Sequence, residues 1–223
     1  MITVAQAVAS VIQVKPFLVE SLAEGIVNVS CLARKIQPQV EALTMRKVKQ
    51  GAIVMAVNRF VPQLDVSLNR NLKKLVENLG DIIVRSDLTD YTFKNSTTLV
   101  NGHSKVLKIV SEHPDVFYTF VRGVFESNLV VSSSYVKIVD THFASEECLF
   151  KGSNLSAITI KLPTANTTVS GFYYYILKAI AWEGINIREV ISTTNEFSII
   201  INDEDVDRAF AVLKHLKKSP NMM

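Results

Sequence analysis

From residue 81 to the C-terminal end, the sequence repeats one order of strand and helix patterns, and this repeat restricts the possible folds more than any other feature. Alternating apolar residues predict a strand, and apolar residues three and four positions apart predict a helix. Residues 81–152 show the order βαββαβ, and residues 153–223 show it again without a clear closing strand. The sequence therefore predicts an α+β protein with two ferredoxin-like βαββαβ units.

The first copy begins with two extended stretches, DIIVRSDL and DYTFK. Two further strands lie within residues 116–133 and turn near either 122–123 or 126–128; a helix at 135–143 and a strand at 147–151 follow. Between these strands the run STTLVNGHSKVLKIVSEH predicts a helix that Pro114 ends. Its inward face is expected to consist of Leu99, His103, Val106, Leu107 and Val110.

The second copy begins with the strand SAITIKLP and a helix that reaches Gly184. INIREVIST and EFSIIIND form a hairpin around Thr194 and Asn195, and a last helix starts with acids and ends with bases, as a helix dipole favours. The final residues SPNMM are too short and polar for a closing strand. We therefore expect residues 82–86, which precede the first copy's helix, to fill that edge of the second sheet.

Residues 1–75 differ from the rest in charge, with ten Lys and Arg against four Asp and Glu, whereas the remainder has 14 against 17. We interpret residues 1–80 as a separate basic, helical domain, followed by domains at 81–152 and 153–223. Helices are expected at 2–12 and at 16–24, where Gly25 stops the second.

Three more helical patterns complete this part of the chain. One helix has Ser30 as its N-cap and is interrupted at Pro38, and another spans residues 48–60. The last has Ser67 as its N-cap and Leu68, Leu72, Leu75 and Leu79 in step, and it connects the two parts of the chain.

The helical patterns within residues 28–60 resemble a helix-turn-helix. In that family the second helix enters the major groove of DNA, where polar and basic side chains meet base edges and phosphates. The alternative is a helical cap whose lysines keep it soluble. The residues that this resemblance assigns to nucleic-acid binding are Arg34, Lys35, Lys47, Lys49, Gln50 and Arg59.

The second copy also resembles a known family. The run VSGFYYYILKAIAWEGINIREVISTTNEFSIIINDEDVDRAFAVLKHL is similar to the ACT domain and, within that family, to the regulatory end of aspartokinases, over residues 155–216. The matching features are Gly171 at the start of the first helix, the EGINI signature at its end, the strand 197–202 and the acidic start of the last helix. Over residues 81–152 the resemblance rests on element order alone.

The ACT resemblance implies a binding site for an amino acid or related metabolite at the loop before the first helix and at the start of the second strand. Backbone N–H groups there suit a carboxylate. An Asn- and Thr-rich run stands where the family usually has Asp-x-x-Gly. The residues carried over as ligand-binding are Asn166, Thr167, Thr168, Ser170, Gly171, Asn186 and Ile187.

We expect no enzyme, no cofactor and no metal site. The chain lacks GxxxxGK[ST], GxGxxG and GxSxG, and its four histidines form no HxxxH pair. Cys31 and Cys148 give no zinc spacing and are expected to be buried thiols. No apolar run approaches the roughly 20 residues of a membrane helix, and the N-terminal residues lack the basic start and small-residue cleavage pattern of a signal peptide, so a cytoplasmic protein is expected.

These observations favour a non-enzymatic small-molecule sensor that regulates transcription through its basic N-terminal helices and forms a homodimer or higher homo-oligomer. The alternative is a stand-alone ACT regulatory subunit of an amino-acid biosynthetic enzyme such as an aspartokinase, with the N-terminal helices bound to protein. A third hypothesis is an assembly module without a ligand. Sequence reasoning leaves these alternatives open.

Overall fold

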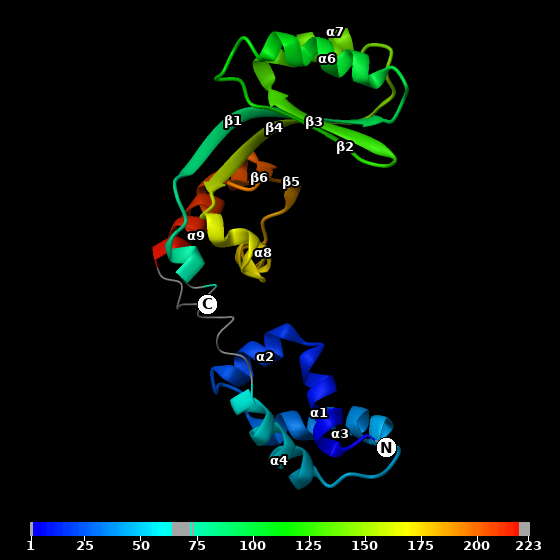
Figure 1. Ribbon diagram of the computed structural model, residues 1–223, viewed down its shortest axis with the longest axis vertical. Coiled ribbons are helices and arrows are strands. Elements are labelled where there is room, and N and C mark those ends of the chain that lie inside the picture. The colour runs from blue at the N-terminus through cyan, green and yellow to red at the C-terminus, as the bar shows by residue number, and fades with distance from the viewer. Residues whose placement is uncertain (1, 64–71, 73, 219–223) are drawn as a thin grey trace. The chain divides into compact units, whose positions relative to one another are not determined.

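The computed structural model describes residues 2–63, 72 and 74–218 (Figure 1). The chain divides into two compact units, Met1–Arg70 and Asn71–Met223.

The first unit is helical in its described residues, and its helices begin and end at recognisable capping residues. Thr3 and Gln6 form a reciprocal capping box at the start of α1, Pro16 opens α2, and Gly25 follows α2 in the left-handed conformation. The side chain of Asn28 accepts a hydrogen bond from the Cys31 N–H and caps α3. The helices are α1 (Val4–Gln13), α2 (Pro16–Ala23), α3 (Val29–Thr44) and α4 (Gln50–Phe60), followed by a 3-10 turn, Val61–Gln63.

Two predictions for α3 are wrong. Its N-cap is Asn28, not Ser30, and the helix continues through Pro38 to Thr44. A proline inside a helix costs about 3 kcal/mol, but buried Ile36, Val40 and Thr44 continue one face of α3 into the core, and this burial offsets the cost.

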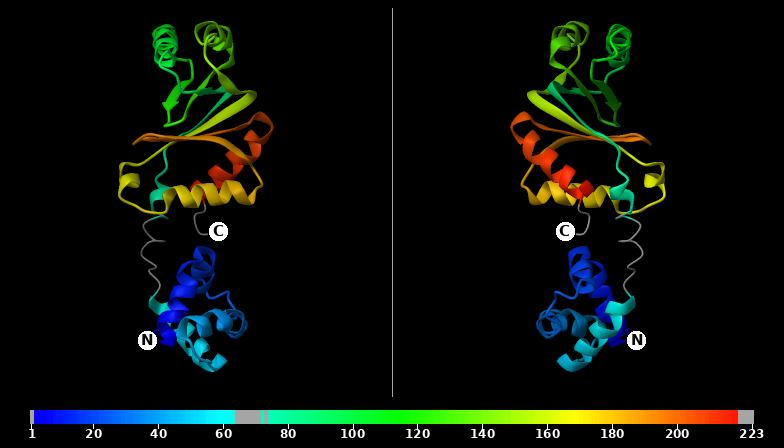
Figure 2. Two further views of the ribbon diagram at one scale, coloured as in Figure 1. Left: turned by 90° about the vertical axis from the view of Figure 1, so that its right-hand side faces the viewer. Right: turned by 90° about the vertical axis from the view of Figure 1, so that its left-hand side faces the viewer.

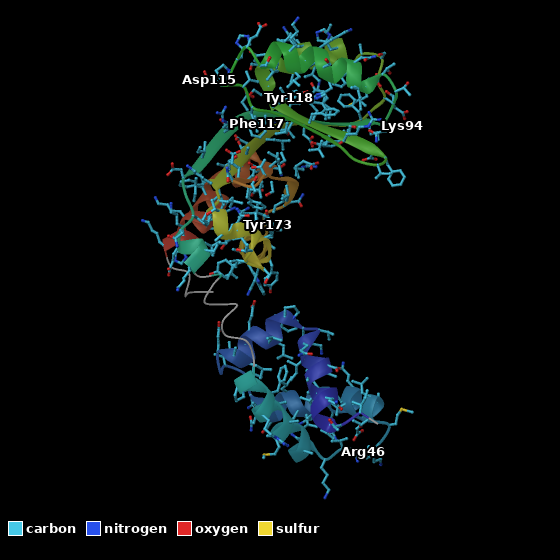
Figure 3. All side chains as sticks on the ribbon, in the orientation of Figure 1. Arg46, Lys94, Asp115, Phe117, Tyr118 and Tyr173 are labelled. Carbon is cyan, nitrogen blue, oxygen red and sulfur yellow. The ribbon has the colours of Figure 1, made fainter. Side chains whose placement is uncertain are left out.

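The connection between α3 and α4 is therefore residues 45–49, and it starts at Met45 in the left-handed conformation. Arg46 lies in this connection and is exposed (Figure 3). Glu41 accepts a hydrogen bond from the Val48 N–H at 2.9 Å, and Gln37 donates to the Val48 carbonyl at 2.8 Å, so two side chains of α3 hold the connection in place. The apolar residues at helical spacing in α4, Ile53, Ala56, Val57 and Phe60, are buried in the core.

The second unit contains one six-stranded antiparallel sheet in the order β2-β3-β1-β4-β6-β5. A helical stretch at residues 74–77 precedes it. Ser67 and Leu68, the predicted start of this helix, lie outside the described residues. The elements are β1 (Ile82–Lys94), α6 (Leu99–Val110), β2 (Tyr118–Arg122), β3 (Glu126–Ser132), α7 (Val136–His142), β4 (Cys148–Lys161), α8 (Phe172–Trp182), β5 (Ile187–Ser192), β6 (Glu196–Asn202) and α9 (Val206–Lys218).

Two long strands run through the centre of this sheet. The stretches DIIVRSDL and DYTFK are one strand, β1, and the predicted strands at 147–151 and 156–163 are also one strand, β4. β1 and β4 pair along their length, with Leu88 opposite Leu155 near the middle. Residues 82–85 pair with 157–160, so the prediction that this stretch fills the edge of the second copy's sheet is confirmed.

The sheet order is symmetrical about the β1–β4 pair. We call α6, β2, β3 and α7 with residues 88–94 and 148–153 the first half, and α8, β5, β6 and α9 with residues 155–161 and 82–85 the second half. Helices α6 and α7 cover the first half, and α8 and α9 cover the second (Figures 1 and 2). The opposite, helix-free faces meet in an apolar cluster of Leu88, Val130, Leu155, Ala157 and Ile200, with Phe117 and Ile191 packed against it.

Three predicted burials are wrong. Leu107 is 44% exposed, because the buried face of α6 runs through Leu99, Gly102 and Val106 instead. A Cβ atom on Gly102 would lie 2.9 Å from the His142 carbonyl, so the close approach of α7 fixes this face of α6. Cys31 and Cys148 are both exposed, in the first turn of α3 and at the first residue of β4.

Each long strand contains one residue with a positive φ where the two halves meet. Asp87 has φ 59° and Asn154 has φ 57°, and both lie at irregularities in the β1–β4 register. Both side chains are exposed. Asp and Asn tolerate this conformation better than other residues with a Cβ atom.

We predict that Asn154→Ala lowers the free energy of unfolding by about 1 kcal/mol, because alanine is disfavoured at positive φ. Asn154→Gly should cost no more than a few tenths of a kcal/mol. Urea unfolding of both variants, with Ser153→Ala as the exposed neighbouring control, measures the difference. Equal effects of the alanine and glycine variants would show that the backbone conformation does not determine stability here.

Candidate functional site

The loop between β4 and α8, residues 162–171, carries most of the predicted ligand-binding residues. It contains a short 3-10 turn, Thr164–Thr167, and ends at Gly171, whose φ of 86° lets the chain turn into α8. Thr164, Thr167, Thr168 and Ser170 are all exposed. The loop therefore presents hydroxyl groups at the surface.

The amide of Asn166 holds this loop in shape. Its Nδ2 donates to the Pro163 carbonyl at 3.0 Å and to the Thr194 carbonyl at 2.7 Å, so it ties the loop to the β5–β6 turn. The Thr168 hydroxyl donates to the Ala165 carbonyl at 3.0 Å, and the Thr167 hydroxyl contacts the Thr164 carbonyl at 3.5 Å. These three predicted ligand-binding side chains contact the loop itself.

A pocket of about 320 Å³ lies beside this loop. Its volume is at the lower end of the range for small-molecule sites. Sequence reasoning did not assign the helix 74–77 to the site, although its leucine periodicity was visible. The pocket is lined by Lys74, Leu75, Asn78, Pro163, Thr164, Ala165 and Val169.

The lining combines an apolar wall with one charged group. Leu75, Pro163, Ala165 and Val169 supply apolar surface, and Lys74 supplies a cation. Asn78 donates from Nδ2 to the Lys74 carbonyl at 2.6 Å. No acidic side chain lines the pocket among the residues that the structure describes.

Asn186 and Ile187 lie away from this loop. Ile187 pairs with Ile201 at the start of β5, whereas Ser192 at its other end pairs with Phe197, next to Ile160. Six residues of extended strand span about 16–20 Å. The structure therefore does not bring the start of β5 together with residues 162–171 within the second half.

The first half contains an equivalent loop, residues 95–98, between β1 and α6. The Asn95 amide donates to the Gly123 carbonyl at 2.9 Å and ties this loop to the β2–β3 turn, as Asn166 does in the second half. The Lys94 N–H donates to the Glu147 carbonyl at 3.0 Å, and the Lys161 N–H donates to the Asp81 carbonyl at 3.0 Å. The two halves therefore share one backbone arrangement around these loops.

One contact distinguishes the two loops. In the first half Glu146 accepts hydrogen bonds from the Ser96 hydroxyl at 2.5 Å and the Thr98 hydroxyl at 2.7 Å. Gly80, the residue before Asp81, takes the equivalent position in the second half and has no side chain. The sequence analysis did not identify Glu146 as a residue that contacts this loop. The available signal was the similarity of the runs NSTT and NTT, which follow β1 and β4.

A second polar cluster lies between the two halves. Asn128 on β3 donates to Asp90 on β1 at 2.7 Å and to Glu189 on β5 at 3.0 Å. Burial raises the pKa of Asp90, although the Asn128 hydrogen bond and the charge of Arg188 partly oppose this. Burial also raises the pKa of Glu189, and the nearby charge of Asp90 raises it further.

The residues that sequence reasoning assigned to nucleic-acid binding are on the surface of the first unit. The exception is Gln50, which is half-buried and donates to the Ser30 carbonyl at 2.9 Å. This contact places the start of α4 beside the first turn of α3. The exposed basic residues of the set are Arg34, Lys35, Lys47, Lys49 and Arg59.

The histidines and carboxylates do not form a metal site among the described residues. His103 is half-buried; its Nδ1 lies 2.7 Å from the Tyr118 hydroxyl, and its ring stacks on Phe120. Burial lowers the pKa of His103. No helix in the described residues is long and apolar enough to span a membrane.

No family model matches the chain, and no curated protein sequence matches it. Solved structures do. The crystal structure of aspartokinase alpha and beta subunits matches with a TM-score of 0.52 and 12% identity, over 63% of this chain and 99% of that chain. The second unit has an ACT-like fold, of the kind found in the regulatory regions of aspartokinases.

Two further matches are less similar in structure. The regulatory subunit of aspartate kinase from Thermus thermophilus matches with a TM-score of 0.47 and 12% identity, over 61% of this chain and 97% of that chain. The aspartate kinase of Clostridium acetobutylicum matches with a TM-score of 0.48 and 17% identity, over 59% of this chain. The chain spans only 33% of that enzyme. The helix-turn-helix resemblance finds no support in these matches.

We predict that Glu146→Ala lowers the free energy of unfolding by about 1–2 kcal/mol, because two hydroxyl donors lose their acceptor. The neighbouring Glu147→Ala removes an exposed ion pair with Lys94 and should cost about 0.5 kcal/mol or less. Denaturant unfolding compares the two. Equal costs would mean that Glu146 does not hold its loop.

A second prediction concerns pH. The pKa values of Asp90 and Glu189 are raised above their ordinary 3.8 and 4.5, so the stability that this pair contributes is fully present below those pH values and is lost as the pH rises through the raised values. Glu189→Gln should therefore lessen the loss of melting temperature as the pH rises above the ordinary pKa of the carboxyl group. Exposed Glu112→Gln is the control, and an unchanged slope in Glu189→Gln would contradict the prediction.

Proposed function

We propose that this chain is a non-enzymatic regulatory protein whose second unit binds a small metabolite and whose first unit binds the regulated partner. The observation that carries the proposal is the pocket beside residues 162–171, at the loop that the ACT resemblance assigns to ligand binding. The ACT-like fold of the second unit supports it. Fold alone does not establish function, so the pocket is the part that must be tested.

The position of the pocket offers a route for regulation. Lys74 and Leu75 belong to the helical stretch at residues 74–77, a few residues after the boundary between the two units at residues 70 and 71. A ligand in the pocket would contact this stretch and the loop before α8 together. Binding would stabilise the conformation in which the ligand makes both contacts. The position of the helical stretch at residues 74–77, which leads along the chain to the first unit, would then depend on whether the ligand is bound.

For the partner we favour a protein over DNA, which makes the chain a regulatory subunit of an amino-acid biosynthetic enzyme. The first unit exposes several large apolar side chains, namely Val14, Phe17, Ile26 and Met45. A pocket of about 520 Å³ lies between α1 and α3. Its lining includes the apolar side chains of Val11, Val14 and Leu43. Exposed apolar surface of this kind favours protein contacts.

The second hypothesis, a transcription regulator, rests on the five exposed basic residues that the helix-turn-helix resemblance assigns to nucleic-acid binding. Salt separates the two hypotheses. Binding through phosphate contacts weakens steeply as salt rises, because each contact releases counterions. Binding through apolar contacts at Val14 and Leu43 would change little with salt and would weaken in a Val14→Asp variant.

The proposal predicts that the purified full chain is stabilised by a member of a panel of the common amino acids and their biosynthetic precursors. A ligand at a hundred times its dissociation constant adds about 2.7 kcal/mol to the free energy of unfolding. Ala165→Trp should abolish the thermal shift, because a large side chain would fill the pocket.

Ala144→Trp, at an exposed turn of the first half, is the matched control and should keep the shift. A flat panel would leave the assembly-module hypothesis as the best account. A thermal shift that persists in Ala165→Trp would place the ligand elsewhere.

A further inference from the structure

Resting on the proposed function, we propose that the pocket beside residues 162–171 selects small carboxylates without an ammonium group, such as 2-oxo acids with a short apolar chain, over the corresponding amino acids. The inference comes from the two equivalent loops of the second unit. One loop holds a carboxylate from its own chain, and the other lies beside a pocket that Lys74 and Thr164 help to line.

The first half shows how a loop of this type binds a carboxylate. The two oxygens of Glu146 accept hydrogen bonds from Ser96 and Thr98, and the Ser96 oxygen in turn accepts from the N–H groups of Thr98 and Leu99 at the start of α6. Hydrogen bonds to an ionised acceptor are stronger than neutral ones. In the first half the carboxylate of Glu146 therefore occupies the hydroxyl donors of the loop.

The second half keeps the loop framework but lacks the internal carboxylate. Asn166 ties the loop to the neighbouring turn as Asn95 does, yet Gly80 stands where Glu146 would be. A Cβ atom on Gly80 would lie 2.8 Å from the Lys161 Cβ, so no larger side chain fits there without displacement. The Thr164 hydroxyl is exposed and lines the pocket.

The lining of the pocket matches a carboxylate with an apolar body. Lys74 can pair with the carboxylate, Thr164 can donate to it, and Leu75 and Val169 offer apolar contact to a short aliphatic chain. A pocket of about 320 Å³ limits the ligand to a small molecule.

The same lining disfavours an ammonium group. None of the lining residues among those described is acidic, and the only charged side chain among them is the cation Lys74. A free amino acid would bring its ammonium group close to this lysine and leave it without an anionic partner. Like charges at such distances repel, and an unpaired charge loses part of its hydration. A 2-oxo acid has the same carboxylate and side chain but no positive charge.

Isothermal titration of the full chain with matched probes tests this inference. The probes are 4-methyl-2-oxopentanoate, L-leucine, 4-methylpentanoate and 4-methylpentanamide. We expect the two carboxylates without an ammonium group to bind about tenfold more tightly than leucine and the amide at low salt. Lys74→Gln should weaken carboxylate binding about fivefold, and exposed Lys105→Gln on α6 should not.

A second pair of variants imitates the loop of the first half, which Glu146 occupies. Asn78→Glu places a carboxylate at the wall of the pocket and should weaken binding of 4-methylpentanoate more than the neutral Asn78→Gln, which also removes the native amide contact. Equal effects of these two variants would overturn the charge argument. So would carboxylate binding that is insensitive to Lys74→Gln.

The outcomes also separate this inference from the proposed function. Tighter binding of leucine than of its 2-oxo acid, lost in Ala165→Trp, would overturn the ligand class and leave the sensor function standing. No binding of these probes, together with a flat panel of amino acids and precursors, would overturn both. Binding of 4-methyl-2-oxopentanoate that is lost in Ala165→Trp and weakened in Lys74→Gln is the expected result.

Discussion

The antiparallel pairing of β1 with β4 is the interaction on which the second unit depends. Each strand serves the first half with one end and the second half with the other, so neither half has a complete four-stranded sheet without both strands. Leu88 and Leu155 face each other where the halves meet and belong to the cluster between the helix-free faces. The halves are therefore expected to fold together, because each contributes a strand to the core of the other.

This shared framework lets the two loops diverge without a change of fold. The amides of Asn95 and Asn166 each tie their loop to the neighbouring hairpin turn, Asn95 through the Gly123 carbonyl and Asn166 through the Thr194 carbonyl. They differ in the contact beside the loop: Glu146 accepts hydrogen bonds from Ser96 and Thr98 in the first half, and Gly80, without a side chain, is its equivalent in the second half. Under the proposed function, the first half holds its loop with its own carboxylate and the second half offers its loop to a ligand. The polar cluster around Asn128 links the halves between these loops.

The first unit follows a different design. Its helices bury one continuous apolar cluster, and the α3–α4 connection is held by Glu41 and Gln37 rather than by a glycine turn. Both basic and apolar side chains are exposed, among them Lys49 and Met45. Such a surface is compatible with either class of macromolecular partner, and the balance between its charged and apolar parts determines how strongly salt affects binding.

Local periodicity and turn residues determined most elements in advance. The apolar spacing in α4, the acidic start of α9 and the hairpin around Thr194 each depend on neighbours a few residues apart, so the sequence alone carries the signal. It also indicated that residues 82–85 belong to the second sheet, because that sheet lacked a strand. Tertiary packing decided the rest. Burial of one face of α3 lets this helix continue through Pro38. The close approach of α7 to Gly102 sets the buried face of α6 and leaves Leu107 exposed. Tertiary packing also separated Asn186 from the loop by the length of β5 and brought Lys74 to the pocket. These outcomes depend on contacts between residues far apart in the chain, and no local pattern encodes them.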